Sequence, residues 1–371
     1  MTTPIKFAVI EYSSKTGKIW THTDERPNFL CDPVKEIDAT SFGCYVSALE
    51  GEHIPLTHLI LGKDSKIVKT IKKAYKRIFG SWPTYDISYL KKFDVLMVVH
   101  QISDGHEITA LTKKIRKKYP HIKIIGVDTQ PYGIVKPYWE KHPDWLANFK
   151  QYLGYCHVYI TVVESTKPAW QELTSTPVEY MPQPYPAEFA LEKYLSYKDK
   201  KPILLVAGVT DRFNIKKGQS VAKAIQKEMP QYNIHIIDTP GLVQDMTNLA
   251  GASYEVIPFQ LWRAHLDYLN KVALVINTDY TKTRGRVQVD CAATGTISVG
   301  ANSDGQVDFY PEYVSDPDIS VEEITKKAIE LLKNEEKYES IAKKAKERLL
   351  FYGYEESRKR LLALASRIKT S

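Results

Sequence analysis

The sequence predicts an α/β protein made of two similar αβ domains. Strand-like and helix-like segments alternate along almost the whole chain, which is the pattern of parallel sheets covered by helices. A polar stretch at residues 192–201 separates a first series of these segments from a second. The length of 371 residues also suits two globular domains. We therefore expect one domain over residues 1–190 and another over residues 200–350.

The first series of segments begins close to the N-terminus. Short apolar and β-branched runs bounded by polar residues indicate strands. In the segment 107–118, Ile108, Leu111 and Ile115 recur at helical spacing and so share one face. The expected strands are 6–11, 56–61, 95–99, 123–127, 158–163 and 178–181, and the expected helices are 66–79, 107–118 and 167–173.

The expected helix 66–79 combines an apolar face with several lysines. Such a helix either packs on its sheet with a solvated basic face, which is the commoner arrangement, or lies on an anionic membrane as a peripheral contact.

The second series follows the polar stretch and ends in consecutive helices. The expected strands are 203–207, 234–237, 255–257, 273–276 and 297–299, and the expected helices are 220–228, 261–270, 289–293, 322–334, 337–351 and 355–368. Two αβ domains joined by a short linker predict a cleft, and ligands of such sheets bind beyond the carboxyl ends of the strands.

The composition narrows the possible ligands and location. The net charge of +7 favours anionic ligands such as sugar nucleotides, a membrane surface or nucleic acid. The four cysteines lie far apart without a Cys-x-x-Cys pair, so we expect reduced thiols and no structural zinc. Neither a secretory segment nor an apolar run of membrane-spanning length is evident. These features together predict a cytoplasmic protein.

One loop has the chemistry of an anion site. It runs from Gly208 to Gly218, between the expected strand 203–207 and the expected helix 220–228, and it carries Arg212 and Lys217. Backbone N–H groups at a helix N-terminus favour phosphate, to which arginine adds a planar fork and lysine a compact charge. The alternative is a solvated basic loop with a glycine turn.

A second informative stretch follows the expected strand 273–276. Gly285 and Arg286 precede a short helix of small residues that contains Asp290 and stops at Gly295. Small residues permit close approach of a helix to a ligand or a sheet. Asp290 either binds a ligand or caps or salt-bridges its own helix. Arg286, with Arg284, either binds phosphate or an anionic acceptor, or forms a solvated surface pair.

Together these two stretches resemble the GT-B glycosyltransferases, in particular the family-4-like members (glycosyl transferases group 1). The resemblance covers roughly residues 93–368 and implies two Rossmann-like domains that face each other across a cleft. It also implies that Gly208, Arg212 and Lys217 contact the diphosphate of a nucleotide-diphospho-sugar. Gly285 and Asp290 fall on the family's second motif, where the acid binds the ribose hydroxyls.

The chain departs from the family at one position. The family's first Glu, eight residues before the second, falls on Lys282 here. In many members that Glu contacts the donor sugar. Either Asp279 supplies the missing acid, or Asp279 caps its own loop and the sugar is handled differently.

The resemblance also bears on the first domain. Family members commonly have an active-site His after the strand that corresponds to 95–99, and His100 occupies that place. A structural histidine is the alternative. Asp128 ends the next strand, where a carboxylate either binds an acceptor hydroxyl or acts as base, or caps a turn. In this family the last helix, here 355–368, packs back on the first domain.

The sequence therefore predicts a glycosyltransferase whose catalytic candidates are Arg212, Lys217, His100 and Asp128. The resemblance implies retention of the anomeric configuration, with no metal and no cofactor apart from the nucleotide-sugar co-substrate. The acceptor stays open among glycan, lipid, protein and nucleic acid. Two alternatives remain: a sugar transferase that modifies DNA, and a non-catalytic GT-B module that binds nucleotide or glycan.

Overall fold

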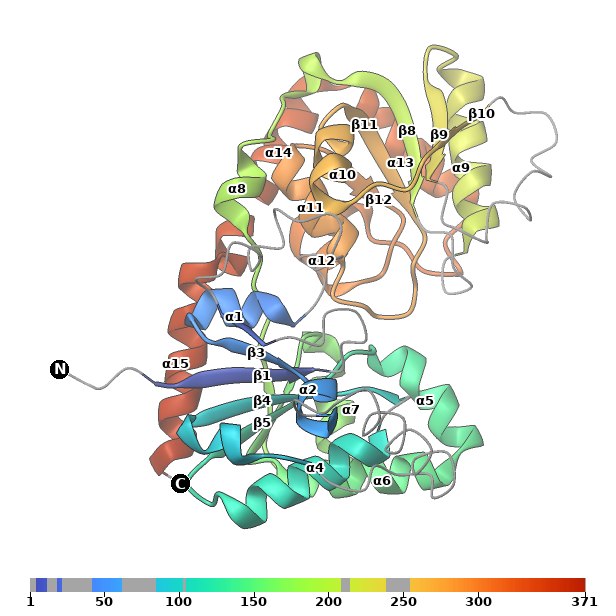
Figure 1. Ribbon diagram of the computed structural model, residues 1–371. Coiled ribbons are helices and arrows are strands. Elements are labelled where there is room, and N and C mark those ends of the chain that lie inside the picture. Colours follow the sequence, from blue (N-terminus) through green and yellow to red (C-terminus); the bar gives the residue numbers. More distant parts are fainter. Residues whose placement is uncertain are drawn as a thin grey trace. The chain divides into compact units, whose positions relative to one another are not determined.

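The chain forms two compact units, each built on its own sheet (Figure 1). The computed structural model describes residues 5–11, 19–21, 42–61, 85–102, 105–207, 214–237 and 254–370. One unit comprises Met1–Tyr185 together with Tyr354–Ser371, and the other comprises Pro186–Gly353. The boundary thus falls a few residues before the expected linker at 190–200.

The first unit contains a seven-stranded sheet of order β2-β3-β1-β4-β5-β6-β7. The edge strand β2 pairs antiparallel with β3, and the other described pairs are parallel. The strands are β1 (Phe7–Glu11), β2 (Trp20–Thr21), β3 (Glu52–Pro55), β4 (Val95–His100), β5 (Lys123–Asp128), β6 (Val158–Thr161) and β7 (Val178–Tyr180).

Helices cover this sheet and bury an apolar core against it. The helix α4 does so through Ile108, Leu111 and Ile115, each fully buried as their spacing predicts. The helices are α1 (Gly43–Leu49), α2 (Leu56–Leu61), α4 (Gly105–Lys118), α5 (Tyr132–Lys141), α6 (Pro143–Tyr155), α7 (Lys167–Gln171) and α15 (Tyr354–Thr370). Short 3₁₀ turns lie at Ser88–Lys92 and Glu164–Thr166.

One expected strand of this unit is wrong. Residues 56–61 form the helix α2, and the strand is the preceding segment β3. Leu56 and Leu59 are both buried, and their separation by three residues places them on one helical face. Pro55 ends the strand because it offers no N–H to continue the ladder. The expected helix 66–79, with its proposed membrane contact, lies outside the described residues.

The second unit contains a five-stranded parallel sheet of order β10-β9-β8-β11-β12. Its strands are β8 (Lys201–Ala207), β9 (Asn233–Ile237), β10 (Tyr254–Ile257), β11 (Val272–Asn277) and β12 (Ile297–Val299). Its helices are α8 (Ala187–Leu191), α9 (Ile215–Glu228), α10 (Trp262–Leu269), α11 (Arg286–Thr294), α12 (Asp304–Phe309), α13 (Val321–Leu332) and α14 (Glu335–Leu349), with 3₁₀ turns at Tyr197–Asp199, Pro311–Tyr313 and Leu350–Tyr352.

A partly buried lysine joins the ends of two helices in the second unit. Lys200 Nζ donates to the carbonyl oxygens of Asn270 and Thr294 at 2.9 and 3.1 Å, and to Thr296 Oγ1 at 3.1 Å. Asn270 caps α10 and Thr294 ends α11, so a positive charge lies where two helices leave carbonyl groups unpaired. Burial lowers the pKa of Lys200 to about 7.

The last helix of the chain, α15, packs on the first unit, against α1 and β5. Its buried stripe consists of Leu361, Leu364, Ala365 and Ile368. Arg358 forms a bidentate pair with Glu50, which follows α1. The end of the chain therefore supplies part of the core of the unit in which the chain begins.

Within the described ranges, no helix combines the length and the apolar character needed to cross a bilayer. The same residues contain no group of three or more His, Cys, Asp and Glu side chains that could hold a metal ion.

Candidate functional site

Two helices of the second unit begin at the same edge of its sheet. The strands β8 and β11 pair in parallel, with Ala207 opposite Asn277 at their carboxyl ends, and α9 and α11 follow them. Asn214 N–H donates to Thr278 O at 3.2 Å, and Thr278 Oγ1 donates to Asn214 O at 2.8 Å. These bonds fasten the start of α9 to the turn after β11. Helix N-termini favour anions, so this edge suits a phosphate-bearing ligand.

The predicted lysine lies in the first turn of α9. Asn214 caps this helix by accepting from the Lys217 N–H at 3.2 Å. Lys217 Nζ donates to the carbonyl oxygens of Asp316 and Pro317 at 2.9 and 3.1 Å and lies 5.4 Å from the centre of the Tyr280 ring. Burial lowers the pKa of Lys217. Its ammonium group is thus held at the sheet edge, and these two acceptors from the described part of the chain use two of its three hydrogens.

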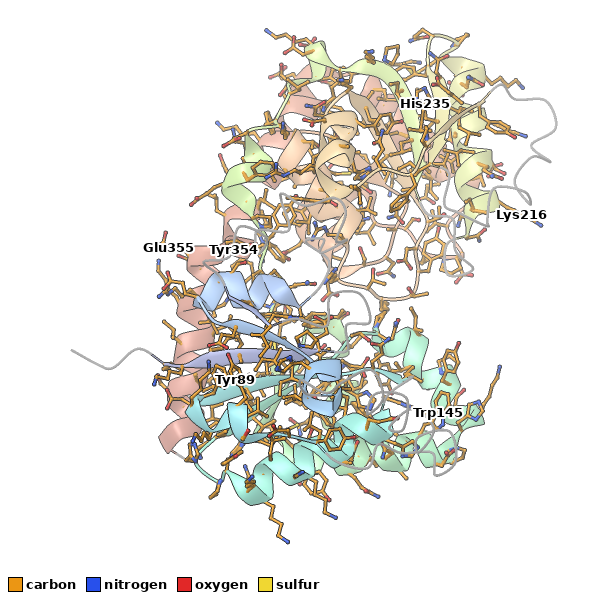
Figure 2. The ribbon with its side chains drawn as sticks, in the orientation of Figure 1. Tyr89, Trp145, Lys216, His235, Tyr354 and Glu355 are labelled. Atoms are coloured by element: carbon orange, nitrogen blue, oxygen red, sulfur yellow. The ribbon has the colours of Figure 1, made fainter. Side chains whose placement is uncertain are left out.

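The glycine after this lysine brings α9 close to the sheet. A side chain at Gly218 would approach Val206 Cγ1 to 3.2 Å and Thr278 Oγ1 to 3.3 Å. The exposed neighbour Lys216 extends away from the same turn (Figure 2). Two other predicted phosphate contacts, Gly208 and Arg212, lie outside the described residues.

Gly285 starts α11 in a conformation that only glycine adopts easily. Its φ is 79°, and a Cβ there would lie 2.7 Å from backbone atoms of Gly305 and from Ser303 Oγ. Gly305 is equally constrained, because its Cβ would lie 2.7 Å from Gly285 O. The contact between two glycines needs the tertiary structure to be seen.

Asp290 is tied to its own helix and to its neighbour α10. Arg286 Nε donates to Asp290 Oδ2 at 3.1 Å, and Trp262 Nε1 donates to Asp290 Oδ1 at 2.9 Å. The carboxylate is 5% exposed. The salt bridge within its own helix, one of the roles expected for Asp290, is present.

Asp279 uses its carboxylate within its own loop. Oδ1 accepts from the Thr281 N–H at 3.0 Å and from Thr281 Oγ1 at 2.6 Å, and Oδ2 accepts from Thr283 Oγ1 at 3.3 Å. The side chain is 3% exposed. This is the loop-capping alternative of the sequence analysis. Lys282, in contrast, is exposed and donates to Asn302 Oδ1 at 3.0 Å.

The two predicted site residues of the first unit contact each other. His100 and Asp128 end the neighbouring parallel strands β4 and β5 in the same register. His100 Nδ1 donates to Asp128 Oδ2 at 2.7 Å, and Asp128 Oδ1 accepts from the Gln130 N–H at 2.6 Å. Both side chains are buried. Asp128 therefore caps a turn and also holds the imidazole in one tautomer and one orientation.

A glycine that the sequence analysis did not select shapes the surroundings of His100. A Cβ at Gly105, the first residue of α4, would lie 2.8 Å from His100 Nε2. The imidazole also packs on Phe149 and Tyr152, with ring centres 4.8 and 5.0 Å apart. The only signal in the sequence was a glycine just after the expected strand 95–99, at the start of a helix.

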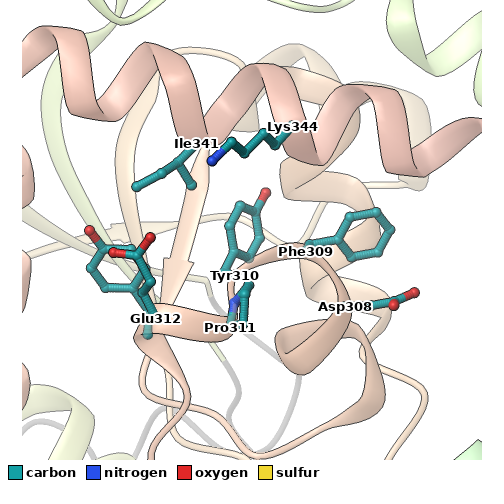
Figure 3. Close-up of a pocket in the computed structure, with 8 residues that line it drawn as sticks. Asp308, Phe309, Tyr310, Pro311, Glu312, Ile341 and Lys344 are labelled. Atoms are coloured by element: carbon teal, nitrogen blue, oxygen red, sulfur yellow. The ribbon is translucent and has the colours of Figure 1, made fainter.

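A separate cavity of about 190 Å³ lies in the second unit between α14 and the segment that ends α12 (Figure 3). Its lining residues are Asp308, Phe309, Tyr310, Pro311, Glu312, Tyr313, Ile341 and Lys344. Tyr310 donates to Thr296 O at 2.8 Å, just before β12 begins. None of the predicted site residues that the structure describes lines this cavity.

Known proteins of similar structure support the fold expected from the sequence. No protein-family profile and no curated protein sequence matches the chain. A sucrose-phosphate synthase from Thermosynechococcus elongatus aligns over 98% of this chain and 99% of its own, with a TM-score of 0.62 and 15% identity. A trehalose-6-phosphate synthase aligns over 97% and 99%, with a TM-score of 0.66 and 8% identity.

A third similar structure is that of the Anabaena protein HepE in complex with UDP-glucose. It aligns over 98% of this chain and 100% of its own, with a TM-score of 0.63 and 10% identity. Such likeness across nearly the full length of each protein shows that the chain has the GT-B fold.

Proposed function

We propose that this GT-B protein is a glycosyltransferase that moves a sugar from a nucleotide-diphospho-sugar to an acceptor. The observation that carries the proposal is the convergence of two helix N-termini, with Lys217 and Arg286 in their first turns, at one sheet edge. A diphosphate is the group that such an edge binds best. A structure of the same fold in complex with UDP-glucose supports this choice of donor.

In this proposal, the second unit binds the donor. Lys217, together with Arg212, would stabilise the diphosphate as negative charge develops on the leaving group. Two carbonyl oxygens already hold the Lys217 ammonium, so little reorganisation is needed when phosphate binds. Asp290 would accept from the ribose hydroxyls while Trp262 and Arg286 keep its carboxylate in place. Retention of configuration, without a metal ion, follows from the resemblance of these motifs to family 4.

The first unit would contribute His100 to the transferred sugar or the acceptor. Asp128 accepts a hydrogen bond from the Nδ1–H group of His100, so Nε2 is the ring nitrogen that would contact the substrate. The N-terminus of α4 lies beside this atom, because Gly105, the first residue of α4, packs against Nε2. In this proposal the first unit binds the acceptor.

A non-catalytic GT-B module that binds nucleotide or glycan is the second candidate. The observation in its favour is that Asp279 turns its carboxylate into its own loop while Lys282 occupies the place of the family's Glu. A catalyst releases nucleoside diphosphate from a nucleotide sugar, whereas such a module binds the nucleotide sugar without releasing it.

Calorimetric titration of UDP and uridine tests the proposed phosphate site. Replacing Lys217 by Ala removes a charge-assisted bond, and such bonds contribute roughly 1.5–3 kcal/mol. We expect the Kd for UDP to rise about tenfold or more, with little change for uridine. Lys227→Ala, at the exposed far end of the same helix, is the matched control. Equal loss of both ligands in Lys217→Ala would reject the phosphate assignment.

A further inference from the structure

The loop between β11 and α11 turns its acid inward and a cation outward. Asp279 is buried and accepts three hydrogen bonds from Thr281 and Thr283. Lys282 is exposed and ends at Asn302 Oδ1, 3.0 Å from its Nζ. The group presented at the carboxyl edge of the sheet is therefore an ammonium rather than a carboxylate.

The backbone holds Lys282 in an unfavourable conformation. Its φ is 54°, in the left-handed region that glycine or asparagine adopts at lower cost than lysine. Two backbone bonds join its loop to the next one, from Asn302 N–H to Asp279 O at 3.1 Å and from Asp304 N–H to Thr283 O at 3.0 Å. Strained residues held by their surroundings are concentrated at functional sites, so the lysine itself calls for an explanation.

Donors of the protein hold the acids around this loop in place. Asp290 accepts from Arg286 and Trp262, and Asp316 Oδ1 accepts from the N–H groups of residues 318 and 319. Asp304 lies in the first turn of α12, where the helix N-terminus stabilises a carboxylate. Lys217 adds a second ammonium beside Tyr280. Between Thr278 and Gly285, Lys282 is the residue that is exposed, so the charge that this loop offers to a ligand is positive. A ligand with a negative group beyond its diphosphate suits that charge.

We propose that the transferred sugar carries a carboxylate, as in a nucleotide-diphospho-uronic acid, and that Lys282 binds it. This inference rests on the proposed function and specifies its donor. A carboxylate oxygen would take the place of Asn302 Oδ1 at Lys282 Nζ and form a charge-assisted bond, which is stronger than the bond to a neutral amide. The Asn302 Nδ2 group supplies a second donor for the other carboxylate oxygen.

Calorimetric titration of UDP, UDP-glucose and UDP-glucuronate tests this inference with the full-length protein. We expect the wild type to bind UDP-glucuronate on the order of tenfold more tightly than UDP-glucose. Lys282→Gln should bring this ratio close to one and leave the Kd for UDP unchanged. Lys333→Gln is the matched control. It removes an exposed lysine that directly follows α13. The last carbonyl of α13 accepts from Tyr197, which precedes β8, so Lys333 lies at the opposite end of the sheet from Lys282.

Lys282→Gly separates charge from backbone conformation. It relieves the positive φ and should stabilise the fold, but it should lose the preference for UDP-glucuronate as Lys282→Gln does. A preference that survives in both variants would overturn the inference, as would equal binding of the two sugars by the wild type. If the protein binds GDP and not UDP, the same comparison is made with GDP-mannose and GDP-mannuronate. A protein that binds none of UDP, GDP and ADP contradicts the proposed function itself, whereas binding without preference contradicts only the choice of sugar.

Discussion

At the scale of single residues, Gly105 offers a direct test of His100. A Cβ at position 105 would lie 2.8 Å from His100 Nε2, closer than the ring can tolerate. Because Asp128 and Phe149 hold the ring elsewhere, we expect Gly105→Ala to displace the imidazole. Sugar transfer, measured as release of nucleoside diphosphate, should fall about tenfold, equivalent to about 1.4 kcal/mol in the barrier.

The matched control is Gly154→Ala in α6. A Cβ at Gly154 meets nothing within 4 Å, so this substitution should keep activity and stabilise the helix by about 0.5–1 kcal/mol. Activity at the wild-type level in Gly105→Ala, together with an unchanged NMR signal of the His100 ring, would remove His100 from the proposed mechanism.

Residue type alone does not define the role of the acids in the second unit. Both Asp279 and Asp290 form hydrogen bonds within the protein. Asp290 bonds to Trp262 of α10 and Arg286 of α11, whereas Asp279 closes a turn in its own loop. Asp290 thus remains the stronger candidate for contact with a ligand, and Asp279 is better described as the support of the Lys282 loop.

At the scale of secondary-structure elements, His157 links α4, β5 and β6 and predicts a dependence on pH. It precedes β6, and its Nδ1 accepts the Ile124 N–H of β5 at 2.9 Å, while Arg116 of α4 contacts the ring. Burial, followed by Arg116 and Lys123, lowers the pKa of His157 to about 4. The folded protein therefore keeps this histidine neutral at pH values where the unfolded chain protonates it.

The sign of the effect follows from proton binding. Between the unfolded pKa of about 6.5 and the folded pKa of about 4, the unfolded chain binds more protons, so the free energy of unfolding falls as pH falls. We expect a loss of about 1–2 kcal/mol from pH 7 to 4.5, after a discount for the partly exposed ring. Urea unfolding at the two pH values measures it.

His157→Gln keeps a hydrogen-bond acceptor but does not titrate in this range. The variant should lose less stability than the wild type over the same change of pH. If both proteins lose the same amount, other groups cause the acid sensitivity and the histidine does not.

At the scale of the whole molecule, the chain leaves the first unit, forms the second and returns through α15. Leu364 is 2% exposed in the stripe by which α15 packs on this unit. Leu364→Ala should cost about 2–4 kcal/mol, because a cavity remains where the side chain packed. Hydrogen exchange should then accelerate in α1 and β5, which α15 contacts, but not in β8 and β11 of the second unit.

Lys359→Ala is the control for this experiment. Lys359 lies on the same helix, and its partners Glu355 and Glu356 are exposed, so the loss of these pairs should change stability little. Unchanged exchange in α1 and β5 of Leu364→Ala would show that the first unit does not depend on its C-terminal helix.

The sequence by itself determined the α/β class, the alternation of the elements and the likeness to GT-B proteins. These properties depend on residues that are close together along the chain: apolar runs make strands, and residues three or four apart make one helical face. The local pattern gave the wrong element for the short apolar run 56–61, because Leu56 and Leu59 can be buried by a helix as well as by a strand. Such short runs are ambiguous until their packing is known.

Only the tertiary structure decided which side chains meet. His100 and Asp128 are 28 positions apart, and the same separation lies between Trp262 and Asp290. The first pair depends on the register of two neighbouring strands, and the second on the packing of α10 against α11. Gly285 and Gly305 are likewise needed because the N-terminal ends of α11 and α12 meet there. A sequence pattern records the preference of each segment, but hydrogen-bond partners and close contacts arise only when distant segments pack together.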